Sequence, residues 1–350
     1  MPSRDEAFVL WLALIVGLFG NAPAASEARL GFIGDVSFAG RTDLPGAIFD
    51  EVAAALRAPD VMVANVEGLL IVGGAPAYGE ARLDISASPR WAATFAGSGI
   101  DLLGVANNHA WDAGARGVLE NLTHVGGQGV PVFGSGTSAE AAFAARRFET
   151  AAGCVSFVPA TLKSNRRPKA GAFVAYYGPR GAREIAELER FVAAERAAGC
   201  APIVSIHWGR EAKPLPDPQV VAVGHALVAA GAVLVVGHHP HVLQGVEWRD
   251  GPHGRAAIAW SLGNFVFKNR DPDKRRTGLL EVVVTRRDGD GVARVSEVAL
   301  RPMTIDVRTF RPRRATAGEA DEHARVMAKR SAPFGTVVQR DGERLVFSRR

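Results

Sequence analysis

The sequence predicts an α/β fold, and three observations support that prediction. Short apolar stretches, typical of buried strands, alternate along the chain with longer stretches of helical apolar spacing. Polar residues follow directly after most of the short apolar stretches. The chain has 350 residues, of which 47% are hydrophobic, so it can bury a full core without covalent support. The same numbers exclude a disordered chain, and the two cysteines exclude a small disulfide-rich protein.

The expected strands are short and rich in valine, leucine and isoleucine. In chain order they cover residues 29–33, 61–64, 102–105, 130–133, 155–158, 203–206, 233–236, 257–260, 278–285 and 292–300. The strand-rich end of the chain indicates a second, more antiparallel sheet. The expected helices cover residues 46–57, 89–96, 115–125, 182–198 and 219–230. The stretch from Lys268 to Thr277 is expected to be a polar loop.

The first 25 residues are predicted to be a signal peptide or an N-terminal anchor. An apolar run from Ala7 to Gly20 follows Arg4, and it is shorter than the ~20 residues that a membrane-spanning helix needs. Ala22-Pro23-Ala24 then has the small-x-small pattern of a cleavage site. A buried N-terminal helix is the alternative. We therefore expect a periplasmic or other extracytoplasmic protein, secreted or membrane-anchored. Cys154 and Cys200 could pair there, although spacing alone does not establish it.

Residues 311–350 are expected to form a basic C-terminal extension. Residues 301–350 contain 12 Lys or Arg and 6 Asp or Glu, a net charge of +6, while the whole chain carries +5. The body of the protein is therefore close to neutral, which argues against nucleic acid as a partner. The tail is expected to be a solvated, partly mobile end, or a contact for an anionic polymer or lipid head groups.

Polar residues at the ends of the predicted strands indicate a metal site. In open α/β sheets, ligands bind beyond the carboxyl ends of strands, so separate segments can meet there. The candidates are Asp35, Asn65, Glu67, Asn108, His109, His207, His238, His239 and His241. Each alone has an ordinary explanation as a cap, a turn residue or a buried histidine. Together, their imidazole, carboxylate and amide groups suit a divalent Mn, Fe or Zn ion. Pro240 is expected to hold His239 in an extended conformation, which would align it with His241.

Six motifs in a fixed order indicate a known family. They are Gly34-Asp35 with Arg41; Asn65-Val66-Glu67; Asn107-Asn108-His109 with Asp112; His207-Trp208-Gly209 with Glu211; Gly237-His238-His239-Pro240-His241; and Ser261-Leu262-Gly263-Asn264-Phe265. With these motifs the chain resembles the CapA family of poly-γ-glutamate capsule synthesis, in the calcineurin-like metallophosphoesterase superfamily. The motifs span residues 34–265, about two thirds of the chain.

The resemblance implies a four-layer α/β/β/α sandwich of the metallo-dependent phosphatase type over residues 26–310. It implies one or two divalent ions, which would activate water for attack on a phosphorus or carbonyl centre. The implied metal ligands are Asp35, Glu67, Asn108, His207, His239 and His241. His109 would be the general acid. The implied supporting or substrate-contacting residues are Arg41, Asn65, Glu211, His238 and Asn264.

The chain also departs from the superfamily pattern. Ser37 stands where the superfamily has a histidine, Asn-x-Glu replaces Gly-Asp in the second motif, and Ala110 stands where many phosphoesterases have an acidic residue. The missing histidine puts a complete two-metal centre in doubt.

The expected function is that of a metal-dependent hydrolase in capsule or poly-γ-glutamate biosynthesis or export. Its partner would be a capsular polymer, a phosphoester or a γ-glutamyl substrate, and it could belong to a membrane-bound synthesis complex. The chain has no P-loop motif, so it is not expected to be the amide-forming ligase. The main alternative is a non-catalytic, membrane-proximal scaffold or polymer-binding module with a degenerate metal site. A weaker alternative is a serine hydrolase, because residues 259–263 resemble a nucleophile elbow around Ser261.

Overall fold

The computed structural model describes residues 25–43, 48–73, 85–166, 173–178, 183–287 and 289–350. The predicted leader, Ala7–Gly20, lies outside these residues. Within them, no helix has the length and apolar character needed to cross a membrane.

The described strands form two large sheets and one small one. The first sheet has the order β17-β18-β15-β14-β1-β2-β3-β4, and β13 and β16 pair at its side with β1 and β15. Its strands are β1 (Ser26–Val36), β2 (Val61–Val66), β3 (Leu102–Gly104), β4 (Val132–Phe133), β13 (Asn264–Val266), β14 (Arg276–Arg286), β15 (Arg294–Ile305), β16 (Pro312–Arg314), β17 (Thr336–Asp341) and β18 (Arg344–Arg349). The antiparallel strands near the C-terminus therefore extend the N-terminal sheet. The expectation that they build a second sheet was wrong.

The second sheet comes from the middle of the chain. It has the order β11-β12-β10-β9-β7-β6. Its strands are β6 (Arg146–Thr150), β7 (Gly153–Thr161), β9 (Ala201–His207), β10 (Leu234–His238), β11 (Val246–Gly251) and β12 (Gly254–Ala259). A small sheet pairs β5 (Ser135–Gly136) with β8 (Phe173–Val174). Cys154 in β7 and Cys200 beside β9 form a disulfide.

The helices are α2 (Ala53–Leu56), α3 (Gly114–Gly126), α4 (Ala139–Phe143), α5 (Ile185–Ala197), α6 (Pro218–Ala229), α7 (Pro272–Arg275) and α8 (Ala317–Ser331). Short 3-10 helices cover η2 (Asp50–Val52), η4 (Pro89–Thr94) and η5 (Ala332–Phe334). The stretch expected to be a polar loop contains α7, whose N-cap Asp271 accepts a hydrogen bond from the Asp273 amide. That expectation missed both the cap and the start of β14 at Arg276.

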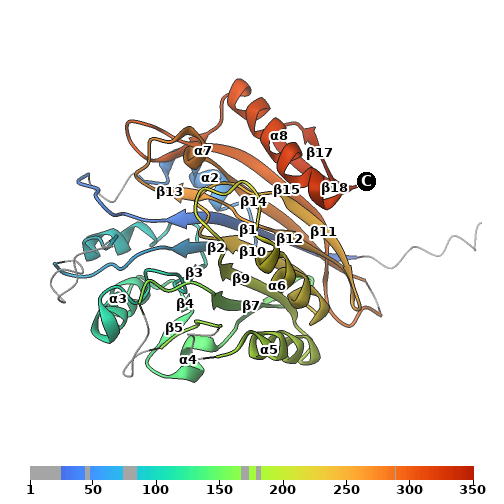
Figure 1. Ribbon diagram of the computed structural model, residues 1–350, viewed down its shortest axis with the longest axis horizontal. Coiled ribbons are helices and arrows are strands. Elements are labelled where there is room, and N and C mark those ends of the chain that lie inside the picture. Colours follow the sequence, from blue (N-terminus) through green and yellow to red (C-terminus); the bar gives the residue numbers. More distant parts are fainter. Residues whose placement is uncertain (1–24, 44–47, 74–84, 167–172, 179–182, 288) are drawn as a thin grey trace, which may run out of the picture.

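Alternating side chains along the strands produce the four layers. In β1, Phe32 points into a core that both large sheets share, and the next residue, Ile33, points into a separate outer core. That outer core packs the first sheet against η4 and α2, and a third core packs α5 and α6 against the second sheet. In Figure 1 the strands of the two sheets overlap in the centre of the view, with α5 and α6 beside β9 and β10 of the second sheet. The α/β/β/α sandwich predicted from the sequence is confirmed.

The C-terminal segment is folded onto the sandwich. Helix α8 contacts β17, β15 and β11, and β18 is hydrogen-bonded to β15. Met327 and Phe347 of this segment belong to the core between the sheets. Figure 1 shows α8, β17 and β18 together at the C-terminal end. The expectation of a solvated, mobile end was therefore wrong, because the segment buries its own apolar face.

Strand register brings the predicted site residues to one edge of the sandwich. In the first sheet Asp35 pairs with Asn65 and with Asn264. In the second sheet His238 pairs with His207. Gly34 makes the close approach to the 262–264 segment possible, because a Cβ atom there would lie 2.1 Å from the Gly263 carbonyl oxygen.

Candidate metal centre

Six predicted ligands meet at the edge where the strands of both sheets end. Asp35, Glu67 and Asn108 come from the ends of β1, β2 and β3, and His207, His239 and His241 come from the ends of β9 and β10. Every one of these side chains is buried. Far-separated parts of the sequence thus build one compact polar cluster inside an otherwise apolar fold.

The cluster contains two sets of donor atoms that share one carboxylate. One set is Glu67, His207 and His239, and the other is Asp35, Glu67 and His241; within each set the donor atoms lie within 4.8 Å of one another. The Oε1 atom of Glu67 is 3.7 Å from the Nε2 atoms of both His207 and His241. Glu67 would therefore be a ligand in either set if a cation were bound there.

The carboxylate of Glu67 has no hydrogen-bond partner among the described residues, and the Nε2 atom of His241 lies 3.7 Å from its Oε1 atom. Both of its oxygens are buried and accept no hydrogen bond from the described part of the chain. Burial raises the pKa of Glu67 well above its usual value. Burying a carboxylate that accepts no hydrogen bond is unfavourable, and a bound cation would offset that cost. The oxygen and imidazole donors around it fit a divalent transition metal.

Asn108 completes the first donor set. Its Nδ2 atom donates to the Oδ1 atom of Asn165 at 3.1 Å, which directs its own Oδ1 atom to within 2.7 Å of His207 Nε2. His239 Nδ1 lies 3.1 Å from the same Nε2 atom. Burial, reinforced by His239, lowers the pKa of His207 well below its usual value. Burial, together with His241, lowers the pKa of His239 to about 3. Both rings are therefore neutral and available as ligands.

Asp35 anchors the second donor set. Asn65 Nδ2 donates to its Oδ1 atom at 2.8 Å, and His238 Nδ1 lies 3.3 Å from that same oxygen. His241 Nδ1 lies 3.2 Å from Oδ2. Burial opposes ionisation of Asp35, but the two histidines beside it hold its pKa well below the usual value. Asn65 and His238 thus both contact the Oδ1 atom of Asp35 and hold its carboxylate in place.

Asn264 sets the orientation of His241. Its Nδ2 atom donates to the Lys274 carbonyl oxygen at 3.0 Å, so its Oδ1 atom faces His241 Nδ1 at 2.9 Å. The Nδ1 atom must then carry the proton, and the Nε2 atom faces Glu67. Burial disfavours the charged ring, yet Glu67 and Asp35 raise the pKa of His241 to about 9. The charged ring carries its second proton on Nε2, facing Glu67, and a cation bound at Nε2 would displace this second proton.

The backbone around Pro240 has an unusual conformation. His239 has φ of 96° and His241 has φ of 57°, both in the left-handed region. The expectation of an extended His239 was wrong: the two rings converge through two left-handed residues and not through strand alternation. Residues held in this region are strained and cluster at functional sites.

His109 is held beside the cluster by residues to which sequence reasoning gave no role. Its Nδ1 atom lies 2.5 Å from Asp112 Oδ2, and its Nε2 atom lies 3.9 Å from Glu67 Oε1. Asn165 Nδ2 lies 3.1 Å from His109 Nδ1 and 3.2 Å from Asp112 Oδ1. The one signal for Asn165 was its position shortly after β7, another strand that ends at this edge.

Other predicted residues lie farther from the donors. Arg41 donates to Asp43 and to the carbonyl oxygens of Thr309 and Phe310, so its guanidinium serves a structural network. Glu211 is 56% exposed, and its Oε2 atom lies 3.9 Å from Lys274 Nζ. Its charge helps raise the pKa of Glu67, after burial and the charge of Asp35.

Ser37 and Ser261 each carried an expectation from the sequence, one about the first motif and one about a serine nucleophile. Ser37, which replaces the superfamily histidine, is buried, and its hydroxyl has no partner among the described residues. Ser261 is 1% exposed; it donates to the Val242 carbonyl oxygen and accepts from the Gly263 amide. Strand β13 follows it, where a nucleophile elbow needs a helix. The serine hydrolase alternative was therefore wrong.

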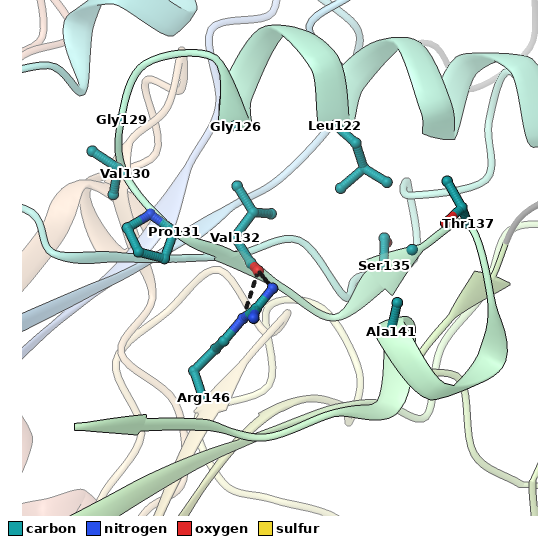
Figure 2. Close-up of a pocket in the computed structure, with 11 residues that line it drawn as sticks. Leu122, Gly126, Gly129, Val130, Pro131, Val132, Ser135, Thr137, Ala141 and Arg146 are labelled. Carbon is teal, nitrogen blue, oxygen red and sulfur yellow. Dashed lines mark hydrogen bonds between the residues drawn. The ribbon is translucent and has the colours of Figure 1, made fainter.

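A cavity of about 530 Å³ lies between α3, β4, β5 and α4. Figure 2 shows Arg146, a charged residue of its lining, directed at the Val132 carbonyl oxygen. The Nε and Nη2 atoms donate to that oxygen at 3.1 and 2.9 Å. The described residues of the lining offer neither a carboxylate nor an imidazole.

Fold and site together define an α/β/β/α sandwich protein with a buried carboxylate, amide and imidazole cluster of metal-ligand type. The chain belongs to the family described as bacterial capsule synthesis protein PGA_cap, whose model matches residues 29–269.

Named relatives agree with this membership. The "PGA biosynthesis protein CapA" of Bacillus subtilis is 28% identical over 284 residues, which is 78% of this chain and 72% of that protein. The "Capsule biosynthesis protein CapA" of Bacillus anthracis is 26% identical over 232 residues, or 63% of this chain and 53% of that protein. A crystal structure of a Thermus thermophilus protein has a TM-score of 0.39 and 10% identity, covering 72% of this chain and 93% of that one. That likeness is too low to support an argument.

Proposed function

We propose that this protein is an extracytoplasmic, metal-dependent hydrolase of capsule or poly-γ-glutamate biosynthesis, acting on a phosphoester or γ-glutamyl bond. The observation that carries the proposal is the buried carboxylate of Glu67, which two sets of imidazole and oxygen donors share. Family membership supports the biological setting.

The proposed ligands of one ion are Glu67, Asn108, His207 and His239. The proposed ligands of a second are Asp35, Glu67 and His241. A divalent cation there supplies Lewis acidity, which lowers the pKa of water and withdraws charge from a phosphoryl or carbonyl oxygen. Mn, Fe and Zn all suit this donor set.

His109 donates the proton that the leaving group needs. Asp112 accepts a hydrogen bond from Nδ1, so the ring keeps one orientation with Nε2 facing the cluster. Asn165 holds both the His109–Asp112 pair and Asn108, and therefore links the acid to a ligand. Burial of the whole group excludes bulk water from the proton transfer.

Metal analysis of purified protein tests this proposal. We expect bound Mn, Fe or Zn in the wild type and its loss in His239→Ala and in His241→Ala. His253→Ala is the matched control, because His253 is exposed at the turn between β11 and β12. Hydrolysis would then be assayed on phosphodiester and γ-glutamyl substrates. Absence of metal and of hydrolysis would favour the non-catalytic scaffold.

Ser37 offers a specific reason to test the number of ions. It contributes no imidazole, so the second set has three protein ligands, where the superfamily pattern that the sequence resembles would add a histidine. Titration of metal-free protein should give two ions per chain in the wild type and one in Asp35→Asn. One ion in both proteins would restrict the centre to the first set.

The disulfide supports an oxidising compartment for the mature chain. N-terminal sequencing of protein from the cell envelope should find a chain that begins near residue 25, or an intact leader retained in the membrane. Recovery of the protein only from the cytoplasm would refute the proposed location.

A further inference from the structure

The C-terminal helix α8 docks on the segment between β10 and β11. The side chain of Arg330, in the last turn of α8, is 11% exposed, and its Nη1 atom donates to the Leu243 carbonyl oxygen at 2.5 Å. The hydroxyl of Ser331 accepts a hydrogen bond from the Val246 amide at 3.0 Å. Gly245 makes this approach possible, since a Cβ atom there would lie 2.1 Å from the Arg330 carbonyl oxygen. The end of α8 is therefore fixed against the segment that also contains two of the proposed histidine ligands.

The same guanidinium also holds α7, which lies near both α8 and β13 in Figure 1. Its Nη2 atom donates to the two carboxylate oxygens of Asp273 at 3.0 and 2.7 Å. The carbonyl oxygen of the next residue, Lys274, accepts the hydrogen bond from Asn264 Nδ2 at 3.0 Å. Asn264 in turn orients His241, whose Nδ1 atom lies 2.9 Å from the amide Oδ1 atom. Arg330 thus reaches the histidine by a second route, through its hydrogen-bond partner.

The chemistry of arginine suits this double contact. A guanidinium presents five N–H donors in a rigid plane, so it can serve a carbonyl oxygen and a carboxylate at once. Both α7 and α8 lie beyond residues 29–269, which the family model matches. The support for His241 therefore includes a part of this chain that the family match does not cover. In the first donor set, by contrast, Asn108 is oriented by Asn165 and contacts His207.

We propose that Arg330 is a positioning residue for the second donor set and acts through His241. It holds the main chain that follows His241 and the helix that orients Asn264 in one relative position. Both contacts therefore set the geometry of the hydrogen bond between Asn264 and the His241 ring, and with it the direction of the Nε2 atom that faces Glu67. The inference rests on the proposed function, because it names a residue that controls ion binding at that site.

Calorimetric titration of the metal-free protein with Mn²⁺ tests the inference. We expect Arg330→Met to bind the second ion about tenfold more weakly than the wild type and the first ion equally well, since losing an outer contact to a ligand usually costs about 10- to 100-fold. In the background of Asp35→Asn, which keeps the first ion alone, Arg330→Met should have no effect. Arg330→Lys keeps the charge without the planar fork, so its affinity should be intermediate. Arg325→Met, which removes a 73% exposed arginine from the same helix, is the matched control.

A double variant separates positioning from a general loss of structure. Because Arg330 acts through the hydrogen bond between Asn264 and His241, adding Arg330→Met to Asn264→Ala should weaken binding of the second ion by less than about twofold. A purely structural contribution of Arg330 would make the two losses add. Additive losses, or equal weakening of both ions in Arg330→Met, would overturn the inference.

Proton NMR of the metal-free protein gives a readout that needs no ion. The Nδ1 proton of His241, hydrogen-bonded to Asn264, should give a downfield resonance in the wild type that is absent from His241→Ala. That resonance should disappear in Arg330→Met and persist in Arg325→Met; Arg330→Lys decides in the same way if Arg330→Met does not fold. An unchanged resonance would contradict the inference. The proposed function fails separately, by lack of metal and hydrolysis in the wild type, and the resonance would still decide the role of Arg330.

Discussion

The Nε2 atom of His207 lies 2.7 Å from the Oδ1 atom of Asn108, and this contact joins the two sheets at the cluster. Asn108 follows β3 of the first sheet, and His207 ends β9 of the second. The ligand set therefore depends on how the sheets stack, and a change in their packing would separate its two halves.

Replacing Glu67, the carboxylate that both donor sets share, should remove the stabilisation that a bound metal ion gives. Mn²⁺ at one hundred times its dissociation constant should stabilise the wild type by about 2.7 kcal/mol. Glu67→Gln should lose that response, and its metal-free form should be at least as stable as the wild type, because an uncharged amide has replaced a buried carboxylate that accepts no hydrogen bond. Thermal unfolding with and without Mn²⁺ measures both effects. Glu149→Gln, an exposed carboxylate on β6, should behave like the wild type.

Removing the acid should stop turnover without releasing metal. His109→Ala should lower kcat by about 10²- to 10⁴-fold, the usual contribution of general acid catalysis. Asp112→Asn should lower it by about 10- to 100-fold, since the ring loses the carboxylate 2.5 Å from Nδ1. Asp50→Asn, at an exposed position, is the control. Steady-state kinetics with parallel metal analysis decides the outcome, and loss of metal in His109→Ala would show that His109 is a ligand instead.

The disulfide should contribute measurably to stability. It links positions 46 residues apart, and the loss of such a cross-link usually costs about 2–4 kcal/mol. The double variant Cys154→Ser with Cys200→Ser should unfold at lower denaturant concentration than the wild type. Adding dithiothreitol to the wild type should reproduce the effect and leave the variant unchanged. An identical midpoint with and without reductant would mean that the two thiols are not joined.

The cap of α8 should make stability depend on pH. The hydrogen bonds from Arg313, opposed by burial and helped by the Thr316 amide, lower the pKa of Glu319 from 4.5 to about 2. A lowered pKa stabilises the fold above the unfolded value, and that contribution is lost as the pH falls from about 4.5 to about 2. Glu319→Gln should cost about 1 kcal/mol at pH 7, and the difference from wild type should shrink below pH 4.5. Urea unfolding at several pH values measures this.

Glu322→Gln is the matched control on the same helix. Its half-exposed carboxylate pairs with Arg325 and lies 3.6 Å from Arg276 Nη2, without a helix-capping role, so the substitution should change stability by less than about 1 kcal/mol. A Glu319→Gln effect that is equally large at pH 3 and at pH 7 would contradict the assigned role of the carboxylate.

The sequence could predict the cluster because its signal is local. Asp35, Asn108 and His207 each follow an apolar stretch, and strand ends meet at one edge of a sheet. Arg41 could not be placed this way, since its partners at positions 309 and 310 are nearly 270 residues away in the chain. The motif that contains Arg41 did not reveal that the guanidinium N–H groups already donate to Asp43 and to two carbonyl oxygens.

The C-terminal helix escaped prediction for a different reason. Its buried face contains Ala320, His323, Met327 and Ser331, a set with one strongly apolar residue. His323 is buried because its ring contacts the carbonyl oxygens of Glu319, Thr277 and Met303. The pattern of polar and apolar residues in the sequence cannot show that carbonyl oxygens of β14 and β15 will accept hydrogen bonds from a buried histidine ring.

The left-handed backbone at His239 and His241 has a consequence for protein engineering. Copying the six side chains onto the strand ends of another host protein would not rebuild the site, because ordinary extended residues would aim the two rings elsewhere. A successful transplant would have to carry the whole turn from Gly237 to Val242, together with the neighbouring chain that holds it in that shape.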